Sequence, residues 1–501
     1  MLYAALVPTS GLKGYEMMYE SREDSLMVYP APEGIADGKD FSVYVRLSGS
    51  DRWKEVPCYE VKVDMHDVRK ASMAYFDFKG RVMVRVSFHN YMDIYQVDIR
   101  PQSRKILPSY TERELYFELE RPENLSIEIN RDRFHNLHLF AGTIQQGMPD
   151  IKDAGVKVVS GDLHKPTVHG IHEMDTLFAQ ISRGGCLYFE PGIHYFEECT
   201  LRIPSGANIY LAGGAVVVGS FICDRVTDVR IFGRGVVYLC SFERFSSLRG
   251  TRISHSSNIR VEGITFINPP HYTLYIGGSQ HISVQNIKSF SCEGWSDGID
   301  VMSSSNIFIE DIFMRNSDDC IALYGRRWDY NGDTRNIQVK HSVLWADVAH
   351  PTNIGCHGDY NNEGNMIENI VFSDLDILEH HEPQRQCMGC LCINAGDRNT
   401  VKNVRYENIR IEHIEHGKIL DLQIICGKYN PVPGKKIENI YFKNIYYDGY
   451  GEETSEIKGI GDHNQIENVT FHNLVVRGKR ICSANEGNIH VGEYAYNVKF
   501  Q

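Results

Sequence analysis

Apolar and polar residues alternate in short runs over the first third of the chain. Clear examples are residues 41–47, 81–88 and 115–119. Period-two alternation bounded by glycine, proline, asparagine or aspartate is typical of half-buried β-strands, and many such strands in series predict a β-sandwich. A stretch without a clear period, residues 142–170, ends this pattern. We therefore predict an N-terminal β-sandwich domain over residues 1–160 and a second domain over residues 161–501.

The second domain is dominated by an internal repeat that starts near residue 186. A polar residue, usually asparagine, is followed by isoleucine or valine at the start of an alternating run. The clearest copies begin at Asn258, His281, Asn306, Asn336, Asn369, Asn403, Asn439 and Asn468. Successive copies lie 23 to 36 residues apart. Repeating strands with such a period predict an all-β fold, a β-solenoid in which inward Ile, Val and Phe stack and the asparagines form a hydrogen-bonded ladder.

The unequal spacing of the copies favours a parallel β-helix with loops of different length. A β-propeller would repeat every 40 or so residues with tighter regularity. Helix signals are sparse, and residues 171–181 are the best candidate for a helix.

Composition and charge narrow the classes of partner. The 501 residues include 52 Lys+Arg and 65 Asp+Glu, and the net charge of −13 argues against a nucleic-acid partner. No stretch approaches the roughly 20 apolar residues that cross a bilayer, so we expect no membrane partner. The short apolar segment 2–7 has no cationic flank, and no export signal is visible. Thirteen scattered cysteines, an odd number, favour reduced thiols and a cytoplasmic location.

Three carboxylates fall on two consecutive turns of the predicted solenoid. Aligning Ile299 with Ile321 places Asp297 and Asp319 one turn of 22 residues apart, with Asp318 adjacent. Stacked turns lie about 4.8 Å from each other. Carboxylates so close repel one another, so at least one should hold a proton more tightly than a free aspartate does. One protonated and one ionised carboxyl group are what acid/base cleavage of a glycosidic bond requires.

Residues 258–359 resemble the polygalacturonase family of glycoside hydrolases, family 28, and its clan relative, the dextranase and isopullulanase family 49. Residues 296–300, Ser-Asp-Gly-Ile-Asp, resemble the Asn-Thr-Asp-Gly block of the family, and residues 318–323 resemble its Asp-Asp-Cys block. Residues 268–274 resemble the turn that precedes them. The resemblance implies a right-handed parallel β-helix, and the dextranase branch carries an N-terminal β-sandwich. We interpret Asp300 as a local structural residue beneath the motif.

The resemblance also implies roles for individual residues. Asp318 corresponds to the general acid, Asp297 and Asp319 hold the attacking water as base, and the anomeric centre is inverted. A third family block, Gly-His-Gly, fits His350 by register although both glycines are replaced. His357 matches the residue types of this block better than His350 does, but it matches the register of the block less well. Taken alone, either histidine is more often a surface or core residue with satisfied hydrogen bonds than a functional one.

The fourth block of the family, an Arg-x-Lys that grips the substrate carboxylate, is missing. The corresponding strand, residues 391–394, supplies no cation, and a uronate there would lose a charge-assisted clamp. We therefore predict a neutral sugar at the cleavage subsite. Arg326, Arg327 and Arg385 on neighbouring loops are candidates to replace the clamp from another direction.

Aromatic residues near the motifs are candidates for stacking on sugar rings. They are Trp295, Tyr324, Trp328, Tyr330 and Trp345, of which Trp345 fits the core better. The cysteines within residues 387–392 follow a Glu-His-His-Glu run, but they do not form the two separated ligand pairs typical of zinc sites. We interpret them as inward-stacked residues and predict neither a metal nor a cofactor.

Together these patterns predict an inverting glycoside hydrolase that cleaves an α-linked oligosaccharide or polysaccharide. Two alternatives stay open: a β-helical polysaccharide lyase, which would need Ca²⁺ and an Arg or Lys base, and a noncatalytic glycan-binding solenoid. Besides a carbohydrate, a second copy of the chain is a candidate partner. The sandwich could bind sugar, cap the solenoid or form that homo-oligomer.

Overall fold

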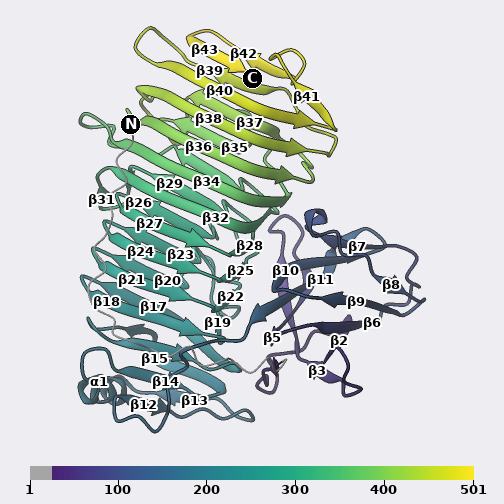
Figure 1. Ribbon diagram of the computed structural model, residues 1–501. Coiled ribbons are helices and arrows are strands. Elements are labelled where there is room, and N and C mark those ends of the chain that lie inside the picture. The colour runs from purple at the N-terminus through teal and green to yellow at the C-terminus, as the bar shows by residue number, and fades with distance from the viewer. Residues whose placement is uncertain (1–24) are drawn as a thin grey trace, which may run out of the picture.

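The computed structural model describes residues 25–501, so the apolar segment 2–7 lies outside the described residues. Two β regions follow one another along the chain (Figure 1). Among residues 25–501, no helix is long and apolar enough to cross a membrane.

The N-terminal region is a β-sandwich of two sheets around a shared apolar core, as predicted. One sheet contains β1 (Ser25–Val28), β4 (Cys58–Val63), β5 (Arg69–Lys79), β7 (Val97–Arg100), β10 (Glu123–Ile129) and β11 (Asp132–Thr143). The other contains β2 (Phe41–Leu47), β3 (Lys54–Val56), β6 (Val82–Phe88), β8 (Ser109–Tyr110) and β9 (Glu114–Leu119). A short 3-10 turn, η1 (Gln102–Arg104), follows β7. Alternate residues of β2 and β6 point into the core, which explains their period-two pattern.

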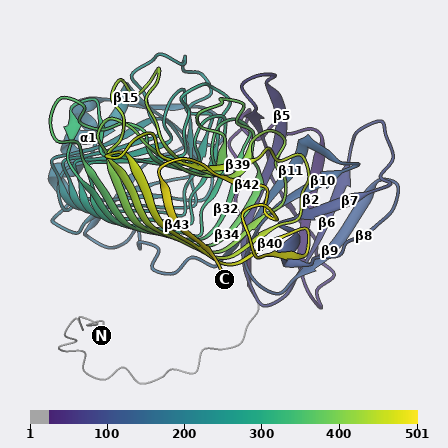
Figure 2. The ribbon, with the colours of Figure 1, turned by 90° about the horizontal axis from the view of Figure 1, so that it is seen from above.

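The rest of the chain is a parallel β-helix whose strands stack in three series, which confirms the predicted fold class (Figures 1 and 2). The first series is β12 (Val156–Val159), β14 (Cys186–Phe189), β16 (Asn208–Leu211), β18 (Thr227–Gly233), β21 (Ser257–Glu262), β24 (Gln280–Gln285), β27 (Ser305–Glu310), β32 (Thr334–Ala346), β34 (Met366–Glu379), β36 (Thr400–Ile411), β38 (Lys436–Tyr447), β40 (Gln465–Val476) and β43 (Ala495–Phe500). The second is β13 (Thr167–His169), β15 (Gly192–Arg202), β17 (Ala215–Asp224), β19 (Val236–Tyr238), β22 (Thr265–Ile267), β25 (Lys288–Phe290) and β28 (Phe313–Asn316), which continues in β32 and the later long strands.

We call the third series the groove face, because it carries the candidate site. It is β20 (Thr251–Ser254), β23 (Leu274–Gly277), β26 (Ile299–Met302), β29 (Ile321–Tyr324), β33 (Thr352–Gly355), β35 (Gly389–Ala395), β37 (Lys418–Ile424), β39 (Ser455–Lys458) and β42 (Ile489–Val491). Two small elements complete the fold, the hairpin of β30 (Arg326–Arg327) with β31 (Tyr330–Asn331), and β41 (Lys479–Ile481) antiparallel to β40.

Stacked asparagines and stacked aromatic rings hold successive turns in register. Side-chain amides bond from Asn336 to Asn306 at 3.0 Å and from Asn369 to Asn336 at 3.1 Å, and the ladder continues through Asn403, Asn439 and Asn468. These asparagines have φ between 56° and 59°, a left-handed conformation that asparagine tolerates better than most residues. Inside the solenoid, the rings of Phe372, Tyr406, Phe442, Phe471 and Phe500 stack with centroids 4.7 to 5.3 Å apart. The predicted ladder is confirmed.

Helix α1 (Ile171–Gln180) is the helix predicted near residues 171–181, and it lies at the N-terminal end of the solenoid (Figure 1). Its Met174 is buried in the solenoid core. The helix therefore covers apolar side chains of the first turns that no preceding turn covers.

The sandwich packs against the side of the solenoid rather than over its end (Figures 1 and 2). At this interface the Arg315 side chain is fully buried. Its guanidinium group donates two hydrogen bonds to the Asp347 carboxylate, of 3.0 and 3.1 Å, and another to Asn136 Oδ1 of the sandwich at 2.9 Å. Trp345 is buried in the same apolar cluster, as expected. The hairpin between β4 and β5 reaches the motif region, where Met65 N–H donates to the Ser317 hydroxyl oxygen at 3.1 Å.

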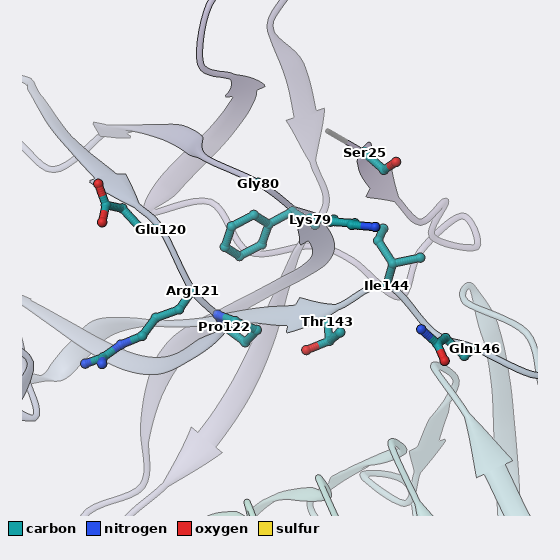
Figure 3. A pocket seen from close by; sticks show the side chains of 10 residues that line it. Ser25, Lys79, Gly80, Glu120, Arg121, Pro122, Thr143, Ile144 and Gln146 are labelled. Atoms are coloured by element: carbon teal, nitrogen blue, oxygen red, sulfur yellow. The ribbon is translucent and has the colours of Figure 1, made fainter. Parts of the chain in front are cut away.

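A hollow of about 610 Å³ lies on the sandwich near the end of β5 (Figure 3). Lys79, Glu120, Arg121 and Gln146 are among its lining residues. None of the predicted site residues lines this hollow, and the candidate active site lies on the groove face instead.

Candidate active site

The groove face arranges three predicted catalytic residues in one column. In the parallel pairing of β26 with β29, Ile299 lies opposite Ile321, so Asp297 and Asp319 occupy equivalent positions two residues earlier. Strand β29 pairs with β33 in a register that places His350 next in the same column. The turn before β26 needs the glycine of its motif, because a side-chain carbon on Gly298 would lie 2.4 Å from the Cys320 carbonyl oxygen.

Asp318 completes a tight group of three carboxylates. One oxygen each of Asp297, Asp318 and Asp319 lies within 4.8 Å of the others. The Trp295 N–H donates to Asp318 Oδ2 at 2.8 Å, and the Asp319 N–H donates to Asp318 Oδ1 at 3.2 Å. Asp297 and Asp319 are buried, whereas Asp318 is partly exposed. The predicted cluster of carboxylates is therefore present, and Asp318 is its partly exposed member.

Asp319 is held by four donors. Its Oδ1 accepts the His350 Nδ1–H at 2.5 Å and the His350 backbone N–H at 3.1 Å. Its Oδ2 accepts the Asn353 amide at 2.8 Å and the Tyr324 hydroxyl at 3.4 Å. The second ring nitrogen of His350 donates to the Cys387 carbonyl oxygen at 2.7 Å. Because both ring nitrogens donate, His350 is an imidazolium paired with an ionised Asp319.

These surroundings separate the pKa values of the carboxyl groups. Burial, together with the charge of Asp319, raises the pKa of Asp318 to about 7. Burial also acts on Asp319, but the charge and hydrogen bonds of His350 outweigh it and hold the pKa of Asp319 below its ordinary value. Burial and the neighbouring Asp300, Asp318 and Asp319 raise the pKa of Asp297 well above its ordinary value. The site thus contains a protonated carboxyl group beside an ionised one.

Asp300 does not behave as the local structural residue that the sequence led us to expect. It lies on the groove face, opposite Tyr275 and Ala322, while its neighbours Ile299 and Val301 point into the core. Its side chain is fully buried, and neither carboxyl oxygen has a hydrogen-bond partner among the described residues. Burial and the charge of Asp319 raise its pKa well above the ordinary value. A local structural role would require hydrogen bonds that Asp300 does not make.

Arg327, His357 and Tyr324 lie together beside the carboxylates. Arg327 Nη1 donates to His357 Nε2 at 2.9 Å, and the His357 ring meets the Tyr324 ring edge-on with centroids 5.0 Å apart. Burial and the charge of Arg327 lower the pKa of His357 to about 3, so this ring is neutral. Arg326 points elsewhere, and its Nη1 donates to Asp359 at 3.1 Å. Of the two arginines, only Arg327 lies near the predicted acid and base.

Two exposed tryptophans line the site. The Trp328 side chain is 43% exposed, and its ring centroid lies 5.4 Å from that of Tyr272 and 6.2 Å from that of His271. The Trp295 ring lies 6.1 Å from the same His271 and 5.7 Å from Phe245. The rings of Trp295 and Trp328 therefore flank His271 and offer apolar faces of the kind that stack on sugars.

The groove face lacks a cation where the Arg-x-Lys block was expected. Strand β35 pairs with β33 so that Cys392 lies opposite Asn353 and Asn394 lies opposite Gly355. Arg385 is in the preceding loop and lines a separate cavity of about 380 Å³. Neither residue of β35 that faces the groove is charged.

A family model describes this part of the chain. The model of glycosyl hydrolases family 28 matches residues 248–492, which include the whole carboxylate cluster and His350. This region is similar to the glycosyl hydrolases of family 28. The resemblance inferred from the Asp-Asp-Cys and Asp-Gly motifs is confirmed.

Individual relatives show how far the similarity extends. Exopolygalacturonase B of Aspergillus niger is 25% identical over 301 residues, which cover 53% of this chain and 65% of the relative. A dextranase of Arthrobacter globiformis is 21% identical over 373 residues, which cover 65% of this chain and 53% of the relative. The chain thus spans less than two thirds of the length of these curated relatives.

Solved structures agree on the fold. Dex49A from Penicillium minioluteum superposes with a TM-score of 0.64 at 13% identity and covers 95% of this chain and 96% of its own. The family 28 exopolygalacturonase of Yersinia enterocolitica gives a TM-score of 0.51 at 10% identity and covers 83% of this chain and 96% of its own. The first of these matches extends the similarity of fold beyond residues 248–492 into the N-terminal sandwich.

Sequence reasoning missed several residues of the candidate site. Asn353 contacts Asp319 directly, and counting along the strand from His350 would have placed it on the groove face. Tyr272 occupies the position before Asp297 in the same column, and its segment had drawn attention only as a turn. Met65 comes from the sandwich, and no sequence signal linked it to Ser317.

Two groups of side chains have donor atoms close enough to share a metal ion. They are Asp297, Asp318 and Asp319, and His350, Cys387 and Cys392. The carboxylate group offers few free oxygens, because those of Asp319 already accept bonds from His350, Asn353 and Tyr324. Ca²⁺ takes six to eight oxygen ligands, so the carboxylate group fits a calcium ion poorly.

Proposed function

We propose that the protein is an inverting glycoside hydrolase that cleaves an α-linked oligosaccharide or polysaccharide by aspartate acid/base catalysis. The observation that carries this proposal is the pairing of Asp318 and Asp319. These two residues are adjacent in sequence but have pKa values shifted in opposite directions, and Asp318 alone of the three carboxylates is partly exposed.

In the proposed reaction, Asp318 donates its proton to the glycosidic oxygen as the bond to the anomeric carbon breaks. Asp319 accepts a proton from the attacking water, and Asp297 orients the same water. His350 is a positioning residue, because it fixes Asp319 and keeps it ionised through the bond from Nδ1.

Inversion is supported by the family and by the state of Asp319, although the carboxylate spacing taken alone would favour retention. The nearest oxygens lie within 4.8 Å, closer than the about 6.5–9.5 Å usual for inverting enzymes. Asp318 and Asp319 are neighbours in sequence, and Asp297 stacks on Asp319 from the preceding turn, which accounts for the short spacing. A retaining enzyme needs a carboxylate that attacks carbon, and the four hydrogen bonds to Asp319 weaken it as a nucleophile.

A neutral sugar at the cleavage subsite is supported by the residues of β35. A uronate there would face Cys392 and Asn394 instead of cations, and the carboxylate group opposite would repel it. Arg327 binds His357 and lies near Tyr272 and Asp297, so we propose that it would bind an acidic sugar in a neighbouring subsite. We also propose a cytoplasmic location, which the thirteen free thiols support, and oligosaccharide substrates that can enter cells.

The first test is product release from a panel of neutral and acidic α-linked glycans, with the first-formed anomer recorded by NMR. We expect saccharides that have gained one water, released with inverted configuration from neutral glycans. Retention would contradict the role of Asp319 as base, and unsaturated products that depend on Ca²⁺ would indicate a lyase. Binding of glycans without any cleavage would indicate a noncatalytic solenoid.

The pH profile of kcat/KM should be bell-shaped. Asp318 acts only while protonated, so activity should fall as the pH rises through about 7, the pKa of this carboxyl group. Asp319 acts only while ionised, so the acidic decline should begin only as the pH approaches its pKa, which lies below the ordinary 3.8. A profile that stays flat between about pH 4 and pH 8 would contradict both assignments.

A further inference from the structure

The cavity of about 380 Å³ near Arg385 adjoins the column of catalytic residues. Two of its lining residues, Cys356 and Cys387, contact that column directly. The Cys387 carbonyl oxygen accepts the His350 Nε2–H at 2.7 Å. Cys356 Sγ lies 4.0 Å from the side-chain amide of Asn353, the residue that also donates to Asp319. A group bound in this cavity would therefore lie next to a sugar bound at the carboxylates.

Two loops from consecutive turns of the groove face form the walls of the cavity. Residues 384–387 precede β35, and residues 425–430 follow β37. Gly427 and Asn430 exchange backbone hydrogen bonds of 2.9 and 3.2 Å, so the second loop ends in a tight turn. The buried Asn430 side chain donates to the Cys356 carbonyl oxygen at 2.6 Å. This bond fixes the turn at the edge of the cavity.

The lining of the cavity contains two cations, Arg385 and Lys428, and no carboxylate. Both side chains are exposed. Among residues 25–501, Arg385 forms no hydrogen bond or ion pair, and the Lys428 ammonium donates only to the Tyr429 hydroxyl oxygen, at 3.0 Å. The chain as a whole has a net charge of −13, so this cavity differs in sign from its surroundings. Two cations without a carboxylate partner favour an anionic ligand.

We propose that this cavity is a subsite for a uronic acid, whose carboxylate binds Arg385 and Lys428. A guanidinium group matches a carboxylate through two parallel hydrogen bonds, and the ammonium group adds a second positive charge. Tyr429 beside them is 49% exposed and supplies an aromatic surface for the apolar side of the sugar ring. The volume of the cavity is within the range of pockets that bind small molecules.

The inference rests on the proposed function, because it adds a second sugar unit to the glycan that is cleaved at the carboxylates. The uncharged residues of β35 favour a neutral sugar at the cleavage subsite. A uronic acid in the adjoining cavity makes the substrate a mixed glycan with neutral and acidic units. Arg385, which the sequence suggested as a replacement for the missing clamp, then binds the unit next to the cleavage subsite instead.

The test is a ligand-observed NMR titration of the full chain with methyl α-D-glucuronoside and methyl α-D-galacturonoside. Each is compared with the neutral methyl glycoside that carries a hydroxymethyl group in place of the carboxylate. Arg327→Gln is present throughout, so that the other candidate cation makes no contribution. We expect at least one uronoside to bind about tenfold or more tightly than its neutral counterpart, and high salt to reduce this preference.

Replacing Arg385 and Lys428 together by Gln should abolish the preference for the uronoside. Because both side chains are exposed and lack carboxylate partners, the double variant should unfold at the same temperature as its background. Lys443→Gln is the matched control. Lys443 likewise has no hydrogen bond or ion pair within the described part of the chain, but it lies on β38, outside the groove face. This control should keep the preference.

The inference is overturned if the uronosides bind no better than the neutral glycosides, or if the double variant keeps the preference. Equal losses in the double variant and in Lys443→Gln would overturn it as well. Tighter binding of D-glucose 6-sulfate than of either uronoside would overturn the assignment to a uronic acid. Every arm measures binding rather than turnover, so the failure of the subsite and the failure of the proposed hydrolysis are distinguishable.

Discussion

Replacing Asp318 by Asn should lower kcat by about 10²–10⁴-fold and leave KM nearly unchanged, because the acid acts in the transition state. The asparagine oxygen can still accept the Trp295 N–H, so the turn should keep its geometry. Steady-state kinetics on the glycan identified in the panel measures both constants. A substrate with an activated leaving group needs less protonation, so the loss of kcat should be much smaller on such a substrate.

Asp462→Asn is the control for this substitution. Asp462 is exposed on a distant loop of the solenoid, and its replacement should leave both constants unchanged. If Asp318→Asn instead raised KM and spared kcat, Asp318 would be a binding residue. Equal losses on natural and activated substrates would contradict its role as the acid.

Replacing Asp347 by Asn should destabilise the protein by about 3–5 kcal/mol, because it leaves the charge of Arg315 buried and uncompensated. Arg315 is 0% exposed and makes two of its bonds to this carboxylate. The measurement is the urea unfolding transition followed by tryptophan fluorescence. Trp345 lies in the same interface, and its indole N–H donates to Asp347 at 2.7 Å.

The double variant Arg315→Met/Asp347→Leu tests the cause. Removing both charges of a buried pair is often neutral or stabilising, so the double variant should recover most of the lost stability. Asp37→Asn breaks an exposed contact with Lys39 and should leave the transition where it is. A single variant as stable as the parent would show that Asp347 does not balance the charge of Arg315.

Much of the fold could be predicted because local patterns repeat. Period-two alternation in β2 and β6, and the asparagines at Asn336 and Asn369, reflect contacts between a residue and its equivalent one strand or one turn away. Such contacts recur in every strand pair or turn, so they produce a repeated pattern of residue types in the sequence. The register of Ile299 with Ile321 followed from the same logic and placed Asp297 beside Asp319.

Other features could not be predicted, because they depend on contacts without a period. The sequence treated Asp300 as structural, and only the fold showed that both its oxygens lack partners. The opposite protonation tendencies of Asp318 and Asp319 depend on burial and on the ring of His350, which are set by packing. Arg326 and Arg327 are neighbours in sequence, yet one turns to Asp359 and the other to His357.

The sequence by itself determined the all-β architecture, the stacking of turns and the column of carboxylates, because each of these depends on residues at regular separations. The tertiary structure alone decided how the sandwich lies against the solenoid, which reaches Ser317 through Met65. The partners in this contact are brought together by loops of irregular length, and nothing in the spacing of residues encodes where such a loop ends.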